Sequence, residues 1–399
     1  MKNRPLAIVF AVVLVNMLSF GIVVPLLPYI AGRTGASEFQ IGLLVAAYPL
    51  AQLVGAPMLG RLSDRFGRKP VLLISILGTA LGFVVLALAR SLPLLFASRL
   101  LDGITGGNIN VAQAYISDVT EREERGRALG LIGAAFGLGF VIGPVTGGLL
   151  SDIGYSVPAW VGAALAGANL AFVAAFLPES LSAEARERLA GLKRKIFDFE
   201  GFRHALGHAR VGPILTVRAV TGVSFALFET MFALWAIAAL SYDARTTGLF
   251  LGYVGVLSAL VQGVLIGRLT KRFSDDSLLL ASVALAGVSL AVWGFVTSTW
   301  QLVLLVPPLA LGLAIGQTVM TSALSKAVGR DEVGGVLGIQ TSIMSLTRVI
   351  APVIGGFLLE RATVWSPGLL AGILTLAMVP YAYKTLCIHP GRASCEETF

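Results

Sequence analysis

Five ionisable side chains stand inside long apolar runs of this sequence, where a charge is costly to bury. They are Arg99, Asp102, Arg218, Glu229 and Arg348. Charged residues within membrane-spanning segments are rare, and they mark proton relays and substrate pathways. The two carboxyl groups are therefore candidates for carrying a proton, and the three arginines are candidates for binding an acid or a polar group.

Spacing along the chain separates the two acids. Arg99 and Asp102 are three residues apart, so they share a helix face and are predicted to form an ion pair that lines a cavity. Glu229 has no cation three or four residues away and is the preferred proton-coupling residue, with Asp102 and Arg99 as the other candidates. Arg218 lies near the end of its run and is expected to snorkel toward water.

Polar and aromatic side chains in the same runs could bind a substrate. Amides would supply hydrogen bonds, and aromatic rings would supply an apolar wall. The excess of arginines over acids favours anionic, zwitterionic or neutral amphiphiles over lipophilic dications. The predicted substrate cavity is lined by Asn16, Phe20, Gln52, Asn108, Gln113, Phe136, Phe225, Glu229, Phe232, Gln317 and Arg348.

Twelve apolar windows of about 20 residues, long enough to cross a bilayer, position these side chains. The predicted fold is an all-α membrane protein with twelve transmembrane helices in two six-helix, pseudo-symmetric lobes. The predicted helices are 6–31, 38–60, 71–90, 93–117, 127–150, 157–178, 212–240, 246–268, 277–297, 300–325, 333–359 and 364–385.

Two motifs recur at nearly one offset. The sequence G-R-L-S-D-R-F-G-R-K-P at residues 60–70 predicts a cytoplasmic hinge loop, and a weaker copy, G-R-L-T-K-R-F, begins 207 residues later at Gly267. The sequence G-P-V-T-G-G from Gly143 is echoed by A-P-V-I-G-G from Ala351, 208 residues later. The offset predicts a duplicated half, as in two-lobed transporters.

Cations mark the cytoplasmic side, because Lys and Arg resist translocation. Most of them fall at the N-terminus, in the presumed cytoplasmic loops and in the middle segment, so both termini are predicted to face the cytoplasm. The predicted domains are an N-terminal lobe (1–178), a cytoplasmic linker with an amphipathic helix on the membrane surface (179–211), a C-terminal lobe (212–385) and a cytoplasmic tail (386–399).

Composition excludes several classes of protein. The chain is 56% hydrophobic and 13% charged, with a mean hydropathy of +0.84, which is typical of a membrane protein. The net charge of +8 forms no basic stripe, so no nucleic-acid partner is predicted. Cys387 and Cys395 are too few for a disulfide framework, and His204 and His208 lack a third ligand, so no metal and no cofactor are predicted. The absence of nucleotide-binding, zinc-protease and hydrolase motifs argues against an enzyme.

The motifs resemble those of the major facilitator superfamily. Residues 60–70 resemble its hinge motif between spans two and three, and Gly139, Gly143, Pro144, Gly147 and Gly148 resemble the span-five signature of antiporters. The chain is most similar to tetracycline exporters within the twelve-span drug/proton antiporters, through A-Y-I-S-D at 114–118, R-G-R at 125–127 and L-P-E-S at 177–180.

This resemblance implies roles for particular residues. Asp64, Arg68 and Asp118 would form a charge relay, a conformational latch that also includes Gly60, Arg65 and Gly67. The span-five glycines with Pro144 would keep the lobes closely packed, and Arg99 would take part in proton transfer. The implied function is the export of a small amphiphilic, drug-like molecule in exchange for protons by alternating access.

One position departs from the resemblance. Drug/proton antiporters carry an acid where this chain has Asn16, and an amide cannot titrate. Either the proton site has moved to Glu229 or Asp102, or the protein is a uniporter or symporter for an organic metabolite or organic anion. The expected partners are a small organic substrate, protons and the lipid bilayer. We expect a monomer in the inner, cytoplasmic membrane.

Overall fold

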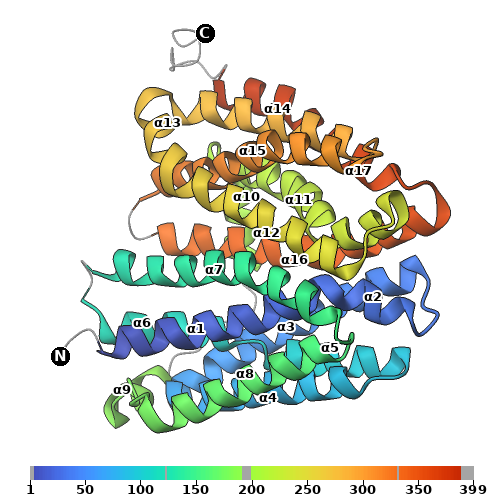
Figure 1. Cartoon of the computed structure of the whole chain (residues 1–399). Helices are drawn as coiled ribbons and strands as arrows, with labels where there is room; N and C mark the ends of the chain where they lie inside the picture. Colours follow the sequence, from blue (N-terminus) through green and yellow to red (C-terminus); the bar gives the residue numbers. More distant parts are fainter. Residues whose placement is uncertain (1–3, 122–123, 191–198, 330–331, 388–399) are drawn as a thin grey trace. The chain divides into compact units, whose positions relative to one another are not determined.

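The computed structural model describes residues 4–121, 124–190, 199–329 and 332–387, and it contains helices and no strand within these ranges (Figure 1). The chain divides into two compact units. The first comprises residues 1–196 and 242–253, and the second comprises residues 197–241 and 254–399. The all-helical prediction is confirmed.

The first unit is a bundle of helices that lie side by side in Figure 1. Its elements are α1 (Arg4–Val23), η1 (Val24–Leu26), α2 (Leu27–Gly32), α3 (Glu38–Phe66), α4 (Arg68–Leu88), α5 (Leu92–Thr105), α6 (Asn108–Val119), α7 (Arg125–Ser151), α8 (Val157–Phe176) and α9 (Ala183–Ala190). The first turns of α12 (Ala244–Leu260) also belong to this unit.

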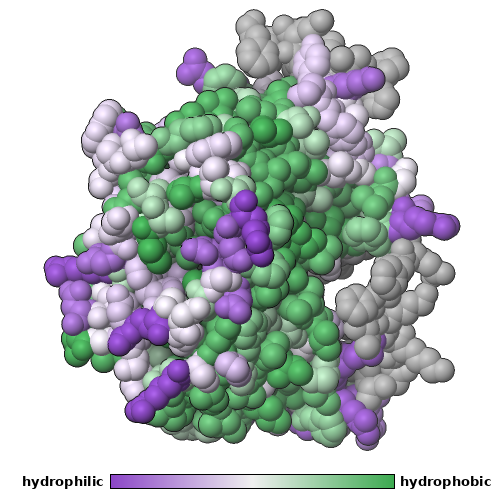
Figure 2. Space-filling model, turned by 90° about the vertical axis from the view of Figure 1, so that its right-hand side faces the viewer, coloured by the Kyte–Doolittle hydropathy of each residue, from purple (hydrophilic) through white to green (hydrophobic). Residues whose placement is uncertain are grey.

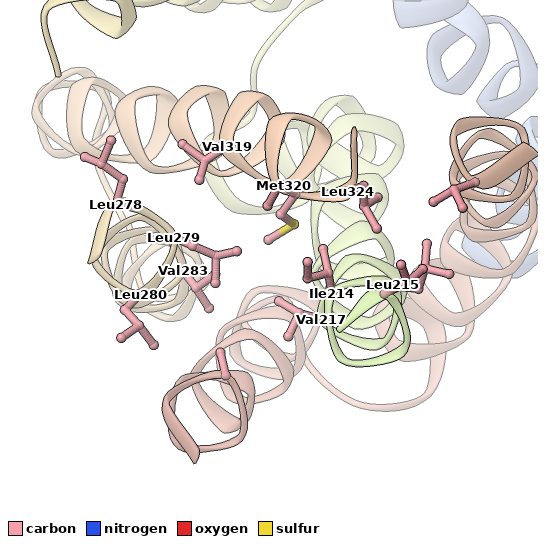
Figure 3. Packing of buried hydrophobic residues seen from close by; sticks show 14 of the residues in the cluster. Ile214, Leu215, Val217, Leu278, Leu279, Leu280, Val283, Val319, Met320 and Leu324 are labelled. Atoms are coloured by element: carbon pink, nitrogen blue, oxygen red, sulfur yellow. The ribbon is translucent and has the colours of Figure 1, made fainter. Parts of the chain in front are cut away.

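The second unit holds the remaining spans. Its elements are α10 (Phe199–Gly207), α11 (Val211–Leu240), the end of α12, η2 (Val261–Leu265), α13 (Ile266–Arg272), α14 (Asp275–Trp293), α15 (Thr299–Lys326), α16 (Val333–Arg361), α17 (Ser366–Ala382) and η3 (Tyr383–Cys387). Figure 3 shows its core, where α11, α14 and α15 meet through Leu215, Val283 and Met320 among others.

Within the described ranges, eleven helices, or runs of consecutive helices, are each long and apolar enough to cross a membrane. The remaining span, the fourth in chain order, is α5 with α6, which a break at Gly106 and Gly107 divides into two shorter helices. Two consecutive glycines weaken a helix. Two carbonyl groups freed by the break accept hydrogen bonds from side chains. Gln52 Nε2 donates to the Gly106 oxygen at 2.7 Å, and Ser75 Oγ donates to the Thr105 oxygen. The prediction of twelve spans is thus confirmed, with the fourth one interrupted.

Prolines interrupt the first span. The prediction placed one helix over 6–31, whereas a short 3-10 turn at η1 separates α1 from α2. Pro25 and Pro28 lie in the first turns of η1 and α2, where their missing N–H groups leave the regular helical bonding incomplete.

The predicted hinge loop at 60–70 is wrong in its local structure. Helix α3 continues to Phe66, α4 begins at Arg68, and Gly67 alone separates them. The polar residues of the motif therefore lie on two consecutive helices. Gly67 has φ +105° and ψ 158°, a conformation that is essentially restricted to glycine, and this reverses the chain direction within one residue.

The surface of the chain is strongly apolar. Large hydrophobic side chains remain exposed on many helices, including Val54, Leu88, Phe176 and Leu304. Figure 2 shows hydrophobic residues covering much of one face. In a membrane such side chains contact lipid, so this surface is expected of a multi-span protein.

The linker contains two short helices, α9 and α10, where one amphipathic helix was predicted, and its place on the membrane surface stays a prediction. Ser182 accepts a hydrogen bond from the Ala185 amide at the start of α9, and in α10 Phe202 and Ala205 pack against the core of the second unit. His208 Nδ1 accepts from the amides of Arg210 and Val211, so it caps α11. No metal-binding group was found among the described residues. The basic run 193–195 lies outside the described residues, as does the C-terminal tail beyond residue 387.

Candidate functional site

The junction of α3 and α4 collects the charges of the hinge motif around Arg68, whose side chain is buried. Its Nη1 lies 2.7 Å from Asp64 Oδ1, and its Nε donates to Asp118 Oδ2 at 2.9 Å. The same Nη1 donates to Ser63 Oγ at 2.6 Å. A buried guanidinium thus lies between two carboxylates, which satisfies its charge.

Glu179 caps the start of α4 at this junction. Its carboxylate accepts hydrogen bonds from the backbone amides of Arg68 (2.9 Å) and Lys69 (3.1 Å), the first free amides of the helix, and from those of Ser180 and Leu181. The Ser180 hydroxyl donates to Asp118 at 3.0 Å. The L-P-E-S segment after the sixth span is therefore tied to the charge cluster of the hinge motif.

The predicted contact of Asp64, Arg68 and Asp118 is confirmed as geometry, and its function as a conformational latch stays a prediction. The other residues of the motif differ in their environment. Arg65 is exposed, with its guanidinium 5.3 Å from the centre of the Phe66 ring. A side chain at Gly60 would meet nothing within 4 Å, whereas one at Gly67 would meet Glu179 Oε2 at 2.4 Å.

Arg99 and Asp102 form the predicted ion pair inside the first unit. Nη1 of Arg99 lies 3.2 Å from Asp102 Oδ2, and the guanidinium lies 5.6 Å from the centre of the Phe83 ring on α4. Their side chains are only 1% and 3% exposed. The expectation that the pair lines a cavity is therefore wrong, because α4 and α5 pack closely around it, with Gly82 directly against Asp102.

Glu229 on α11 and Arg348 on α16 form a second ion pair, in the second unit. Two parallel hydrogen bonds join them, Nη2 to Oε1 at 3.0 Å and Nε to Oε2 at 3.2 Å. The side chains are 17% and 49% exposed respectively. Glu229 was preferred because no cation lies three or four residues away on its own helix, but a neighbouring helix supplies one.

The span-five glycines lie on α7 and make close backbone contacts, as their four-residue spacing predicts. An added Cβ at Gly143 would lie 2.7 Å from the Gly21 Cα, and one at Gly147 would lie 2.1 Å from the Ile22 carbonyl oxygen. Gly139 similarly packs on Met17. The strip is therefore filled by the backbone of α1.

A second face of α7 packs against the first turns of α12. An added Cβ at Gly148 would lie 3.0 Å from the Ala244 carbonyl oxygen, and one at Gly248 would lie 2.3 Å from that of Pro144. Both helices thus contribute small residues where their backbones approach. The predicted role of this motif in keeping the lobes closely packed stays a prediction.

The predicted substrate-cavity residues occupy different environments. Gln52 is held by Gly106 and Tyr48, and Phe20 packs on Tyr48 with ring centres 5.5 Å apart. Phe232 is fully buried among Phe228 and Trp235, so its assignment to a cavity wall is wrong. Among the rest, Asn108 is buried, Asn16 is half-buried, Gln113 and Phe136 are exposed, and Phe225 and Gln317 line a pocket within the second unit.

Sequence reasoning missed a polar cluster around Tyr29. Its hydroxyl bonds to Thr247 Oγ1 at 2.5 Å and lies 3.1 Å from the Tyr242 and Asp243 carbonyl oxygens. Nearby, Arg245 pairs with Asp152 at 3.1 Å. Only Asp243, at the start of α12, had a signal in the sequence, as a helix-capping residue; hydrogen bonds from the Thr246 hydroxyl and amide lower the pKa of its carboxyl group.

A family model described as Major Facilitator Superfamily matches residues 9–275 and 260–390. This chain belongs to the Major Facilitator Superfamily. The tetracycline resistance protein of class C from Escherichia coli is 34% identical over 359 residues, covering 88% of this chain and 89% of that protein. Solute carrier family 22 member 18 from Mus musculus is 31% identical over 344 residues, covering 84% of each chain.

Solved structures of the superfamily share this fold. The nucleoside transporter NupG has a TM-score of 0.80 at 13% identity, covering 96% of this chain and 99% of that one. The human organic anion transporter MFSD10 has a TM-score of 0.69 at 22% identity, with the same coverage. This member of the Major Facilitator Superfamily is therefore a multi-span transporter of a small molecule, similar to tetracycline exporters, and the resemblance seen in its motifs is confirmed.

Proposed function

We propose that this transporter exports a small amphiphilic organic molecule in exchange for protons by alternating access. It would act as a monomer in the cytoplasmic membrane, with both termini in the cytoplasm. The observation that carries the proposal is the Glu229–Arg348 pair, a partly accessible carboxylate held by an arginine from another helix of the same unit. Similarity to tetracycline resistance proteins supports the direction of transport and the substrate class.

Protonation of Glu229 is the coupling step in this proposal. The ionised carboxylate accepts both hydrogen bonds from Arg348, and a proton would cancel its charge and weaken both. A hydrogen-bond donor of the substrate would bind the ionised carboxylate beside Arg348, whose side chain is about half exposed, and a proton on Glu229 would remove that acceptor. Proton and substrate would thus compete for the Glu229 carboxylate, as antiport requires.

The Arg99–Asp102 pair is not the preferred proton-exchange site in this proposal. Both side chains are sealed within the first unit, so a proton could reach Asp102 only if α4 and α5 separated. We therefore assign proton exchange to Glu229, and the Arg99–Asp102 pair is the second candidate for this role. Asn16 cannot titrate, so in this proposal it would bind substrate by hydrogen bonding.

The junction of α3 and α4 would control the conformational change. Asp64 and Asp118 share the charge of Arg68, so loss of one acid would alter the stability of that arrangement without touching Glu229. Asp64→Asn is expected to slow transport and leave substrate binding largely intact. Loss of binding in that variant would mean that the junction shapes the binding site itself.

The test is proton flux in reconstituted vesicles that are acidic inside and carry a pH-sensitive dye. Tetracyclines, lipophilic cations and amphiphilic anions are added in turn. Protein-dependent loss of the gradient with one class is the expected result. Gradients that persist with every class, together with saturable uptake of a labelled compound, would instead identify a transporter that protons do not drive.

Glu229→Gln tests the coupling residue. This variant is expected to lose substrate-driven proton flux and to retain exchange of labelled for unlabelled substrate. Asp276→Asn is the matched control, because it removes an acid from the first turn of α14 in the same unit. Coupling at the wild-type level in Glu229→Gln would remove Glu229 from the mechanism.

A further inference from the structure

A small pocket within the second unit is lined by a buried, positively charged side chain, that of Arg218. Its lining includes Arg218 of α11, Ser282 of α14, Gln317 of α15 and Thr375 of α17. Its volume is about 30 Å³, room for one or two atoms the size of a water oxygen. Sites for drug-sized molecules are roughly 300–1,000 Å³, so this pocket fits a single small group.

The position of Arg218 near the end of its apolar run predicted a side chain that snorkels to water. The structure buries it instead. The residue is only 7% exposed, and its Nε has no hydrogen-bond partner among the described residues. An arginine side chain keeps its charge in proteins. The charge of Arg348, which acts on Arg218, is also positive, so it adds to the cost of burying Arg218.

The second unpartnered group in the pocket is the Thr375 hydroxyl. Thr375 is 1% exposed, and its Oγ1 likewise has no partner in the described part of the chain. By contrast, the hydroxyl groups of Ser282 and Thr221 donate to carbonyl groups of their own helices. Thr375 therefore remains available as a donor in the pocket that Arg218 also lines.

The chemistry of the lining selects the charge of a ligand. The pocket has two unpartnered donors, the Arg218 Nε–H and the Thr375 O–H, and no carboxylate among its lining residues. A cation would be repelled, and a water molecule would satisfy the hydrogen bonds without neutralising the charge. An anion satisfies both needs.

We propose that Arg218 and Thr375 form a binding site for one small monovalent anion within the second unit. The anion balances the single excess positive charge left by Arg218 once Arg348 is paired with Glu229. Two sources share this chemistry: a free inorganic anion such as chloride, and an acidic group of the transported molecule. The site does not depend on proton antiport.

The test is the thermal unfolding midpoint of the purified full chain in detergent. Chloride, bromide or formate replaces gluconate at constant ionic strength, and gluconate is too large for the pocket. The small anions are expected to raise the midpoint in a saturable way, because a ligand that binds only the folded state stabilises it. A midpoint that is the same in all four anions would overturn the proposal.

Two variants locate the effect. In Arg218→Gln and in Thr375→Val, the chloride concentration that gives half of the shift should rise at least about tenfold, because a hydrogen bond to a charged group is worth about that factor. Arg268→Gln, which removes an exposed cation from α13, is the control and should respond like the wild type. Wild-type chloride dependence in both test variants would exclude this site.

A saturating concentration of the compound that the vesicle test identifies as transported distinguishes the two sources of the anion. Chloride dependence that persists with substrate present identifies a free anion, and dependence that disappears identifies an acidic group of the substrate. Because the midpoint is measured without transport, failure of proton coupling in vesicles leaves the result for the anion site unaffected.

Discussion

Gly67 joins α3 to α4, and its replacement by alanine perturbs two interactions at once. At φ +105° and ψ 158°, a side chain costs about 1–3 kcal/mol in backbone strain. The added Cβ would also lie 2.4 Å from Glu179 Oε2 and displace the carboxylate that caps α4. Losing a charged cap costs about 1–2 kcal/mol. Gly67→Ala should therefore lower the free energy of unfolding by about 3 kcal/mol.

A double-mutant cycle separates these two costs. Once Glu179→Ala has removed the carboxylate, Gly67→Ala should cost only the backbone strain, so the two substitutions should be non-additive by about 1–2 kcal/mol. Unfolding is followed in mixed detergent micelles with increasing denaturing detergent. Gly60→Ala in the same motif is the control, because a Cβ there meets nothing within 4 Å.

Two results would refute this reasoning. If Gly67→Ala were as stable as Gly60→Ala, the glycine requirement at this junction would have no structural basis. If the costs of Gly67→Ala and Glu179→Ala simply added, the close approach of the Glu179 carboxylate to Gly67 would not be part of the native structure.

The other predictions concern packing and pairing within the first unit. Gly147→Ala should destabilise the protein by about 1–3 kcal/mol, because its Cβ would lie 2.1 Å from the backbone of α1. Gly137→Ala is the control and should leave the stability unchanged, because a Cβ there meets nothing within 4 Å. Equal unfolding curves for the two variants would contradict the contact. Tyr29→Phe should cost about 1–2 kcal/mol in the same assay through loss of its hydroxyl contacts, and an unchanged curve would count against them. Asp102→Asn should cost about 3–5 kcal/mol by leaving Arg99 unpaired, and replacing both residues with apolar ones should recover most of this loss; no recovery would assign the cost to packing.

Contacts between residues close in sequence were predictable. The Arg99–Asp102 pair follows from three-residue spacing, because a single helix places such side chains on one face whatever surrounds it. Asp64 and Arg68 were expected to pair within a loop, but they lie on two consecutive helices that Gly67 joins. The burial of the Arg99–Asp102 pair was not predictable, because it depends on α4.

Contacts between distant segments had no local signal. Glu229 and Arg348 are separated by 119 residues, and only the packing of α11 against α16 brings them together. Glu179 was noticed as part of a motif, but its role as the cap of α4 depends on where the sixth span ends. Arg218 was misjudged for the same reason, since helices distant in sequence enclose it.

The amino-acid sequence alone was enough to establish the membrane class, the twelve spans and the superfamily, because span length and apolar composition are local properties and the motifs are contiguous. The tertiary structure decided which charges are paired, which are sealed and which remain unsatisfied. Those properties depend on the distances between side chains on different helices, and helical periodicity within one span carries no information about its neighbours.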